Sequence, residues 1–191
     1  IAKTYIELNA EPQFKNLKSH LKLKNGNEVL FDYLNKLKYR KKGFMFENYS
    51  PNGDRKYFSD ENALRIDTFR YLFEEWKDEK KINELEYYYL ITSLLKGVNL
   101  VSNVSGTYGA YLKTWDKRAL NPLKLEAVEI IPSKNKNKVF KRDANELIKE
   151  IHSDILYLDP PYNNRQYASN YFILELIAEG WFNGKPKIYG E

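Results

Sequence analysis

DILYLDPPY, residues 154–162, is the stretch of this sequence that decides the fold we expect. Residues 155–158 are almost wholly apolar, which is typical of a short strand buried on both faces. Pro160 and Pro161 end such a strand, because proline has a fixed φ and no backbone N–H. We therefore expect Asp159 at the carboxyl end of a strand and Tyr162 on a stiff turn beyond it. In open α/β sheets, ligands bind at that edge.

The residues after this strand fit the methylation of an exocyclic amine such as adenine N6. The lone pair of that amine is delocalised into the ring, so the site has to supply acceptors for its hydrogens. The Asp159 carboxylate and the Pro160 carbonyl are such acceptors, and the Tyr162 ring can stack on a base that has left the duplex. The alternative interpretation is a strand with a plain proline stop.

The sequence at these residues resembles a known family. Asp159-Pro160-Pro161-Tyr162 matches the DPPY motif of amino-group DNA methyltransferases, and residues 163–171 (NNRQYASNY) look like those of the D12 class, the Dam-like adenine-N6 methylases. Shorter segments resemble the middle of restriction-associated members: residues 48–51, 57–59, 62–63, 65–67, 101–103, 108–113 and 115–118. The resemblance extends over residues 43–180.

The resemblance implies an α/β fold, a Rossmann-like methyltransferase sheet that is partial in this chain, with a largely helical target-recognition insertion. We expect residues 1–12 to end an N-terminal catalytic part, 13–123 to form the recognition region and 124–191 to carry the catalytic part with the motif. The implied activity is methyl transfer from S-adenosylmethionine to adenine N6 in double-stranded DNA by base flipping. The implied setting is a restriction-modification system in a bacterial or phage-infected cytoplasm, with a cognate restriction enzyme as a further partner.

The resemblance also suggests roles for individual residues. The catalytic set is Asp159, Pro160, Pro161 and Tyr162, and a donor contact is implied for Asp159 and for Asp143, whose other reading is a helix N-cap. Residue types that meet phosphates and base edges occur in two loop-like regions and beyond the motif. The DNA-binding candidates are Asn48, Tyr49, Arg55, Asn103, Thr107, Tyr108, Lys113, Lys117, Arg118 and Arg165. Ordinary surface loops remain the alternative for both regions.

One expected feature is missing from the sequence. Dam-like methylases carry a donor-binding Phe-x-Gly-x-Gly motif near their N-terminus, and nothing here matches it. We expect that piece upstream of Ile1. Two rival hypotheses stay open: a non-enzymatic DNA-binding protein derived from a methylase, and an amino-methyltransferase acting on RNA or on a protein glutamine. The protein-glutamine methyltransferases usually carry Asn at the position of Asp159, which counts against that alternative.

Composition sets outer limits on the function. Lys and Arg number 31 against 26 Asp and Glu, so the net charge of +5 allows a polyanionic partner without demonstrating one. The absence of cysteine excludes disulfides and cysteine-ligated metal sites, and two histidines make no metal cluster. We therefore expect no metal. No stretch is long and apolar enough to predict a membrane span.

Local patterns predict the order of elements. Helices are expected over residues 28–39, 59–76, 84–96 and 169–179, with Ser59 as an N-cap and Asn83 and Glu86 as a capping box. The four lysines of residues 13–24 indicate a solvated helix face or phosphate contacts. Residues 44–54 and 99–118 are expected to be loops. Strands at 125–131, 139–140 and 154–158, with a helix after Asp143, would make a βαβ unit and hence a parallel sheet.

Overall fold

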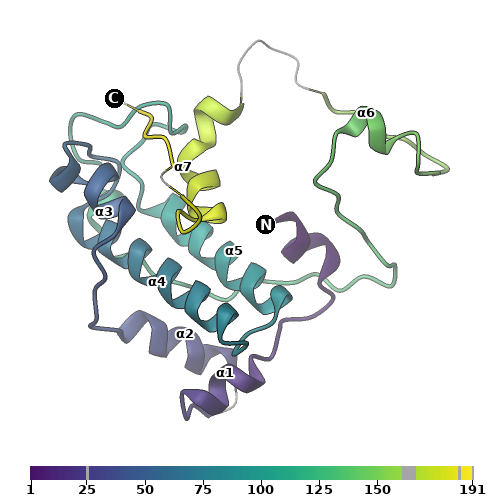
Figure 1. The fold of residues 1–191 in the computed structure, drawn as a ribbon, viewed down its shortest axis with the longest axis horizontal. Coiled ribbons are helices and arrows are strands. Elements are labelled where there is room, and N and C mark those ends of the chain that lie inside the picture. Colours follow the sequence, from purple (N-terminus) through teal and green to yellow (C-terminus); the bar gives the residue numbers. More distant parts are fainter. Residues whose placement is uncertain (25, 161–166, 185, 191) are drawn as a thin grey trace.

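The computed structural model describes residues 1–24, 26–160, 167–184 and 186–190, and its regular structure is helical (Figure 1). A π-helical turn η1 opens the chain at Lys3–Glu7. The α-helices are α1 (Lys15–His20), α2 (Asn27–Lys36), α3 (Phe44–Tyr49), α4 (Asp60–Asp78), α5 (Glu84–Leu100), α6 (Ala144–Leu147) and α7 (Tyr167–Glu179). Two 3-10 turns are η2 (Pro51–Gly53) and η3 (Lys117–Leu120).

Helices α4 and α5 form the centre of the molecule, and their start signals are the ones the sequence predicts. The Ser59 hydroxyl accepts the Asn62 N–H at the start of α4. Asn83 and Glu86 form a reciprocal capping box at the start of α5, with bonds of 2.9 and 3.0 Å. Both caps satisfy N–H groups that have no partner inside the helix. The predicted helices over 59–76 and 84–96 are confirmed.

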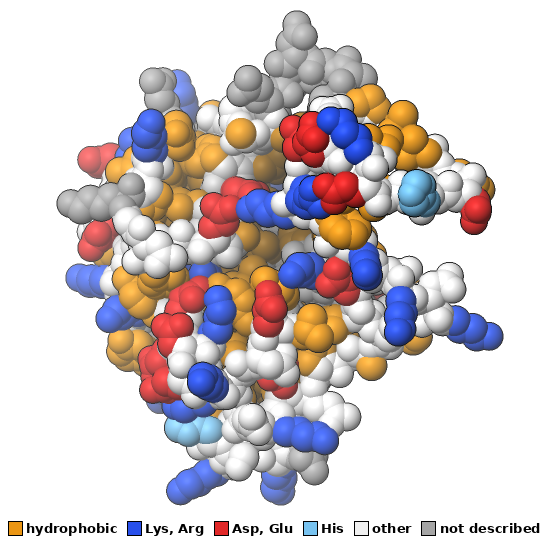
Figure 2. Space-filling model, turned by 45° about the vertical axis from the view of Figure 1, so that its right-hand side comes forward, with side chains coloured by type: hydrophobic (Ala, Val, Ile, Leu, Met, Phe, Trp, Pro, Cys, Tyr) orange, Lys and Arg blue, Asp and Glu red, His pale blue; other side chains and the backbone are white. Residues whose placement is uncertain are grey.

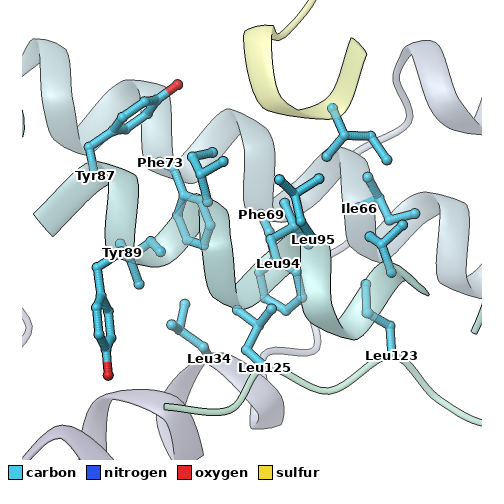
Figure 3. Close-up of a cluster of buried hydrophobic side chains, with 14 of the residues drawn as sticks. Leu34, Ile66, Phe69, Phe73, Tyr87, Tyr89, Leu94, Leu95, Leu123 and Leu125 are labelled. Atoms are coloured by element: carbon cyan, nitrogen blue, oxygen red, sulfur yellow. The ribbon is translucent and has the colours of Figure 1, made fainter. Parts of the chain in front are cut away.

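The hydrophobic core lies between α2, α4 and α5 (Figure 3). Leu34 of α2, Phe69 and Phe73 of α4, and Leu94 of α5 are at most 1% exposed. Apolar side chains from the chain after η3 close the same core: Leu123, Leu125, Val128 and Ile130. That segment was predicted to contain a strand at 125–131, but the structure has extended chain there, tied to helix side chains. The backbone N–H and carbonyl of Leu125 both bond the side-chain amide of Asn35. Those of Val128 both bond the Tyr89 hydroxyl.

Helix α3 corrects the loop predicted for residues 44–54. Asp67 on α4 is fully buried, and its carboxylate accepts the N–H groups of Met45 and Phe46 at 3.0 and 2.9 Å. These are N–H groups of the first turn of α3, so a side chain distant in sequence supplies the cap. The residues next to α3 in the sequence provide no side-chain cap. The start of this helix therefore could not be predicted from the local sequence.

The expected Rossmann-like α/β sheet is wrong for this structure, because the described residues contain no strand. Residues 131–160 form an arm that leaves the helical body, with α6 standing apart from it (Figure 1). Residues 155–158 lie exposed on this arm, Ile155 at 86% and Tyr157 at 83%. Apolar side chains of the arm reach the surface (Figure 2). A strand needs a neighbour to receive its N–H and C=O groups, and none lies beside this segment among the described residues.

Helix α7 brings the chain back to the helical body after the arm. It packs against α5 and buries Ile173 and Ile177. The prediction of a helix at 169–179 ending at Gly180 is confirmed, and Gly180 has the positive φ (82°) expected of a helix terminator. No helix in the described part of the chain is both long and apolar enough to cross a membrane.

Candidate functional site

Residues 104–111 form a closed loop, which we call the recognition loop. Asn103 and Leu112 join its two ends, since the Leu112 N–H donates to the Asn103 carbonyl at 2.8 Å. The loop tip at Ser105, Gly106 and Thr107 is exposed. Gly106 has φ 131° and open space around its α-carbon, so the tip projects away from the body.

Tyr108 anchors the recognition loop against α7. Its side chain is 1% exposed, and its hydroxyl bonds the Asn99 side chain at 3.3 Å. Burial raises the pKa of the Tyr108 phenol, so the ring stays neutral. Its backbone N–H donates to the Asn170 carbonyl at 2.7 Å. Because Asn170 lies in the first turn of α7, this bond joins the recognition loop to the helix that follows the Asp-Pro-Pro-Tyr motif.

Four cationic side chains surround the base of the recognition loop: Lys56, Lys113, Lys117 and Arg118, all exposed. The Lys56 ammonium donates to the Lys113 carbonyl at 3.4 Å, and an Arg118 guanidinium nitrogen donates to the Val104 carbonyl at 3.0 Å. These two bonds use backbone oxygens and so neutralise none of the positive charges themselves. Asp116, 3.3 Å from Arg118, is the one acid paired with this group among the described residues. The arrangement suits a polyanionic backbone.

The predicted DNA-binding residues that lie in the described part of the chain, all except Arg165, fall into two groups. Thr107, Lys113, Lys117 and Arg118 are exposed at or beside the recognition loop. The others use their polar groups within the protein: the Asn48 amide donates to the Phe44 carbonyl, and the Arg55 guanidinium donates to Gly190 and Gly53. The buried members of this second group are Tyr49, Asn103 and Tyr108. Lys56, next to Arg55 in the sequence, is a further residue of the type that meets phosphates, and it is exposed.

A cleft of about 820 Å³ opens where the recognition loop, helix α7 along its length and the C-terminal tail meet. Its lining includes Gly109 of the loop, Ser169 and Phe172 of α7, and Tyr189 of the tail. Phe172 and Tyr189 are in edge-to-face contact, with ring centroids 5.8 Å apart. The cleft thus offers aromatic surface beside the loop, which is what an unstacked base requires.

The motif residues themselves lie on the arm. Asp159 and Pro160 are exposed and lie in no helix or strand, while Pro161, Tyr162 and Arg165 fall outside the described residues. Asp143 is the N-cap of α6, with its carboxylate accepting the Asn145 N–H at 2.8 Å, as one of the two readings predicted. Neither Asp143 nor Asp159 lines the cleft. The cleft therefore does not bring the two implied donor contacts together, and the described residues contain no group of acids and histidines able to hold a metal.

Comparison with known proteins decides the family. The model of the D12 class N6 adenine-specific DNA methyltransferases matches residues 1–184. The chain belongs to this family. Membership in the D12 class implies a methyl donor and a DNA substrate. It also agrees with the resemblance drawn from the motif and its extension.

Curated relatives of this D12-class chain are modification enzymes. It is 46% identical to the type II methyltransferase M.FokI of Planomicrobium okeanokoites over 195 residues, covering 100% of this chain and 29% of that protein. It is 42% identical to the modification methylase StsI of Streptococcus sanguinis, covering 99% and 28%. It is 46% identical to the type II methyltransferase M.NlaIII of Neisseria lactamica, over 72% of this chain and 42% of that protein. The chain thus spans less than a third of the first two relatives, and no solved structure matches it.

Proposed function

We propose that the whole protein methylates adenine N6 at a specific site in duplex DNA, with S-adenosylmethionine as the donor. One observation carries this proposal: the Tyr108 N–H to Asn170 carbonyl bond, which couples a loop of recognition character to the helix after the DPPY motif. The names of the relatives support a place in a restriction-modification system beside a cognate restriction enzyme. The compartment would be the cytoplasm of a bacterium or a phage-infected cell, where the DNA lies.

The division of labour follows from this coupling. Residues 13–123 would form the target-recognition region, and residues 1–12 and 124–191 would belong to the catalytic part. Lys56, Lys113, Lys117 and Arg118 would neutralise phosphates and so bring the duplex to the exposed loop tip. The tip would contact base edges, since it is small enough to enter a groove.

The chemistry of the proposal depends on the motif. Extruding an adenine costs a few kcal/mol and exposes its amine. The Asp159 carboxylate and the Pro160 carbonyl would accept the amine hydrogens, and Tyr162 would stack on the base. Holding the amine in this way fixes the direction of its lone pair, so positioning and electrostatics supply most of the rate enhancement. The donor contributes the methyl group, and Asp143 is the residue of this chain proposed to contact it.

Methyl transfer to DNA by the full-length protein tests the proposal. The protein is incubated with labelled S-adenosylmethionine and duplex DNA of mixed sequence, and the DNA is then digested to nucleosides. The expected result is label in N6-methyladenine. Label in cytosine would contradict the adenine assignment, and donor binding without label in DNA would point to an RNA or protein substrate. Absence of donor binding would favour the non-enzymatic alternative.

A further inference from the structure

Asn103 lies at the base of the recognition loop and is fully buried. Its backbone N–H donates to the Tyr57 carbonyl at 2.8 Å, and its carbonyl accepts the Leu112 N–H at 2.8 Å. Its side-chain Nδ2 donates to the carbonyls of Lys56 and Leu112, both at 2.9 Å, and Oδ1 accepts the Asp116 N–H at 2.9 Å. One side chain therefore joins three separate stretches of backbone.

These bonds require an amide. Nδ2 faces two carbonyl oxygens while Oδ1 faces an N–H, so the group must present two donors and an acceptor in one plane. A carboxylate of the same shape would place negative charge against the carbonyls of Lys56 and Leu112. A methyl group would leave two carbonyls and one N–H without this partner, and each such loss is unfavourable. Asn103 is thus matched to its surroundings at every polar atom.

The tethered backbone carries the cations of the candidate interface. The Lys56 carbonyl itself is bound, Leu112 precedes Lys113, and Asp116 precedes Lys117. Each backbone segment that Asn103 holds therefore presents one exposed ammonium group. The same amide closes the recognition loop, whose tip at 105–107 projects outward. One buried side chain thus ties the base of the loop to the three segments that carry these positive charges.

We propose that Asn103 is a positioning residue for DNA discrimination, which contacts no nucleotide itself. It fixes the recognition loop against the cationic segments. The groups that contact bases therefore keep a fixed position relative to the groups that contact phosphates. The inference rests on the proposed function and refines it, because burial removes Asn103 from the set of direct DNA contacts. Discrimination between sites needs this fixed position, since misplacing contact groups by about 1 Å can cost about a hundredfold in rate.

Asn62 on α4 provides a matched control. It is 1% exposed, and its side chain also makes three bonds: Nδ2 donates to the carbonyls of Ala119 and Asn121, and Oδ1 accepts the Leu123 N–H. These bonds hold the end of η3 and the chain that follows it into the core, and none of them closes the recognition loop. Asn62→Ala therefore removes three side-chain hydrogen bonds, as Asn103→Ala does, but none from the base of the recognition loop.

The experiment compares both variants in the full-length protein, below the lowest of their melting temperatures. The measured quantity is kcat/KM on a duplex containing the wild-type target site, divided by kcat/KM on a duplex with one base pair changed. We expect this ratio to fall about tenfold or more in Asn103→Ala and to stay within about twofold in Asn62→Ala, while both lower the melting temperature. An unchanged ratio in Asn103→Ala would overturn the inference. Failure of the wild type to methylate any DNA would instead refute the proposed function.

Hydrogen exchange in the wild-type protein tests the clamp even where Asn103→Ala does not fold. The Asp116 amide donates to the Asn103 side chain, so it should exchange far more slowly than the amides of Ser105, Gly106 and Thr107 at the tip. An equal exchange rate at Asp116 and at the tip would show that the clamp does not hold, and would overturn the inference as well.

Discussion

The α4–α5 pair and the arm of residues 131–160 share one chain but carry their structure in different ways. The two helices begin at caps that their own sequences provide, and they bury side chains such as Phe73 and Leu94 completely. The arm contains an equally apolar stretch at 155–158, yet that stretch lies exposed and in no regular element. A helix satisfies its backbone internally, whereas a strand depends on a neighbour. Stability is therefore expected from the helical body, and the motif chemistry from the arm.

The largest effect predicted by this contrast concerns Asp159 on the arm. Asp159→Ala should lower methyl transfer by the full-length protein about a thousandfold or more, because the amine of the target base loses its charged acceptor. The melting temperature should not change, since Asp159 is exposed. Transfer of label from S-adenosylmethionine measures the first quantity and thermal unfolding the second. Asp154→Ala, an exposed acid on the same arm, is the control and should leave both unchanged. Substantial activity in Asp159→Ala would refute the catalytic assignment.

Identical substitutions in the two regions should differ in their cost to stability. Leu94→Ala removes a side chain with no exposed surface from α5 and should cost about 2–5 kcal/mol. Leu158→Ala, on an arm residue that is 68% exposed, should change stability by less than about 0.5 kcal/mol. Urea unfolding followed by the fluorescence of buried Trp76 on α4 measures both. Comparable losses would show that the arm is packed in solution.

Asp67 should make the helical body sensitive to pH. Burial raises the pKa of the Asp67 carboxyl to about 7, against the opposing effect of the N–H groups that it accepts. The folded protein therefore holds a proton that the unfolded chain releases above about pH 4. Stability should fall as pH rises from about 4 to 7, by at most about 1.4 kcal/mol per pH unit, and level off above that.

Asp67→Asn removes the ionisable group and should flatten this dependence, although α3 then loses one acceptor. Unfolding free energies measured at several pH values for both proteins provide the test. A wild-type stability that rises between pH 4 and 7, with the same slope in Asp67→Asn, would contradict the raised pKa.

The smallest predicted effect is the difference in unfolding free energy between losing the N-cap of α5 and losing the N-cap of α6. Asn83→Ala breaks the capping box of α5 and should cost about 1 kcal/mol. Asp143→Ala removes the N-cap of the exposed helix α6 and should change the unfolding free energy by less than about 0.5 kcal/mol. If Asp143 also contacts the donor, this variant should raise the KM for S-adenosylmethionine. Chemical unfolding and initial rates at varied donor concentration distinguish the two roles.

The sequence predicted those parts of the fold whose signals are local. Ser59, the Asn83–Glu86 pair and Gly180 mark helix ends that the structure confirms. Helix α3 escaped prediction because its cap, Asp67, comes from another helix. The sheet was wrong because an apolar run indicates burial without specifying a neighbour. The burial of Asn103 could not be predicted from the sequence either, because its bonding partners are spread from Lys56 to Asp116.

Recognition of DNA by the loop region is the central claim of this account, and the salt dependence of DNA binding tests it most directly. The triple variant Lys113→Gln, Lys117→Gln and Arg118→Gln is compared with Lys15→Gln, Lys22→Gln and Lys24→Gln, an equal charge change on exposed lysines near α1. The plot of log K against log salt has a negative slope. The account predicts that the magnitude of this slope decreases by about 3 in the first variant and stays at the wild-type value in the second. The opposite pattern, or an unchanged slope in the first variant, would contradict it.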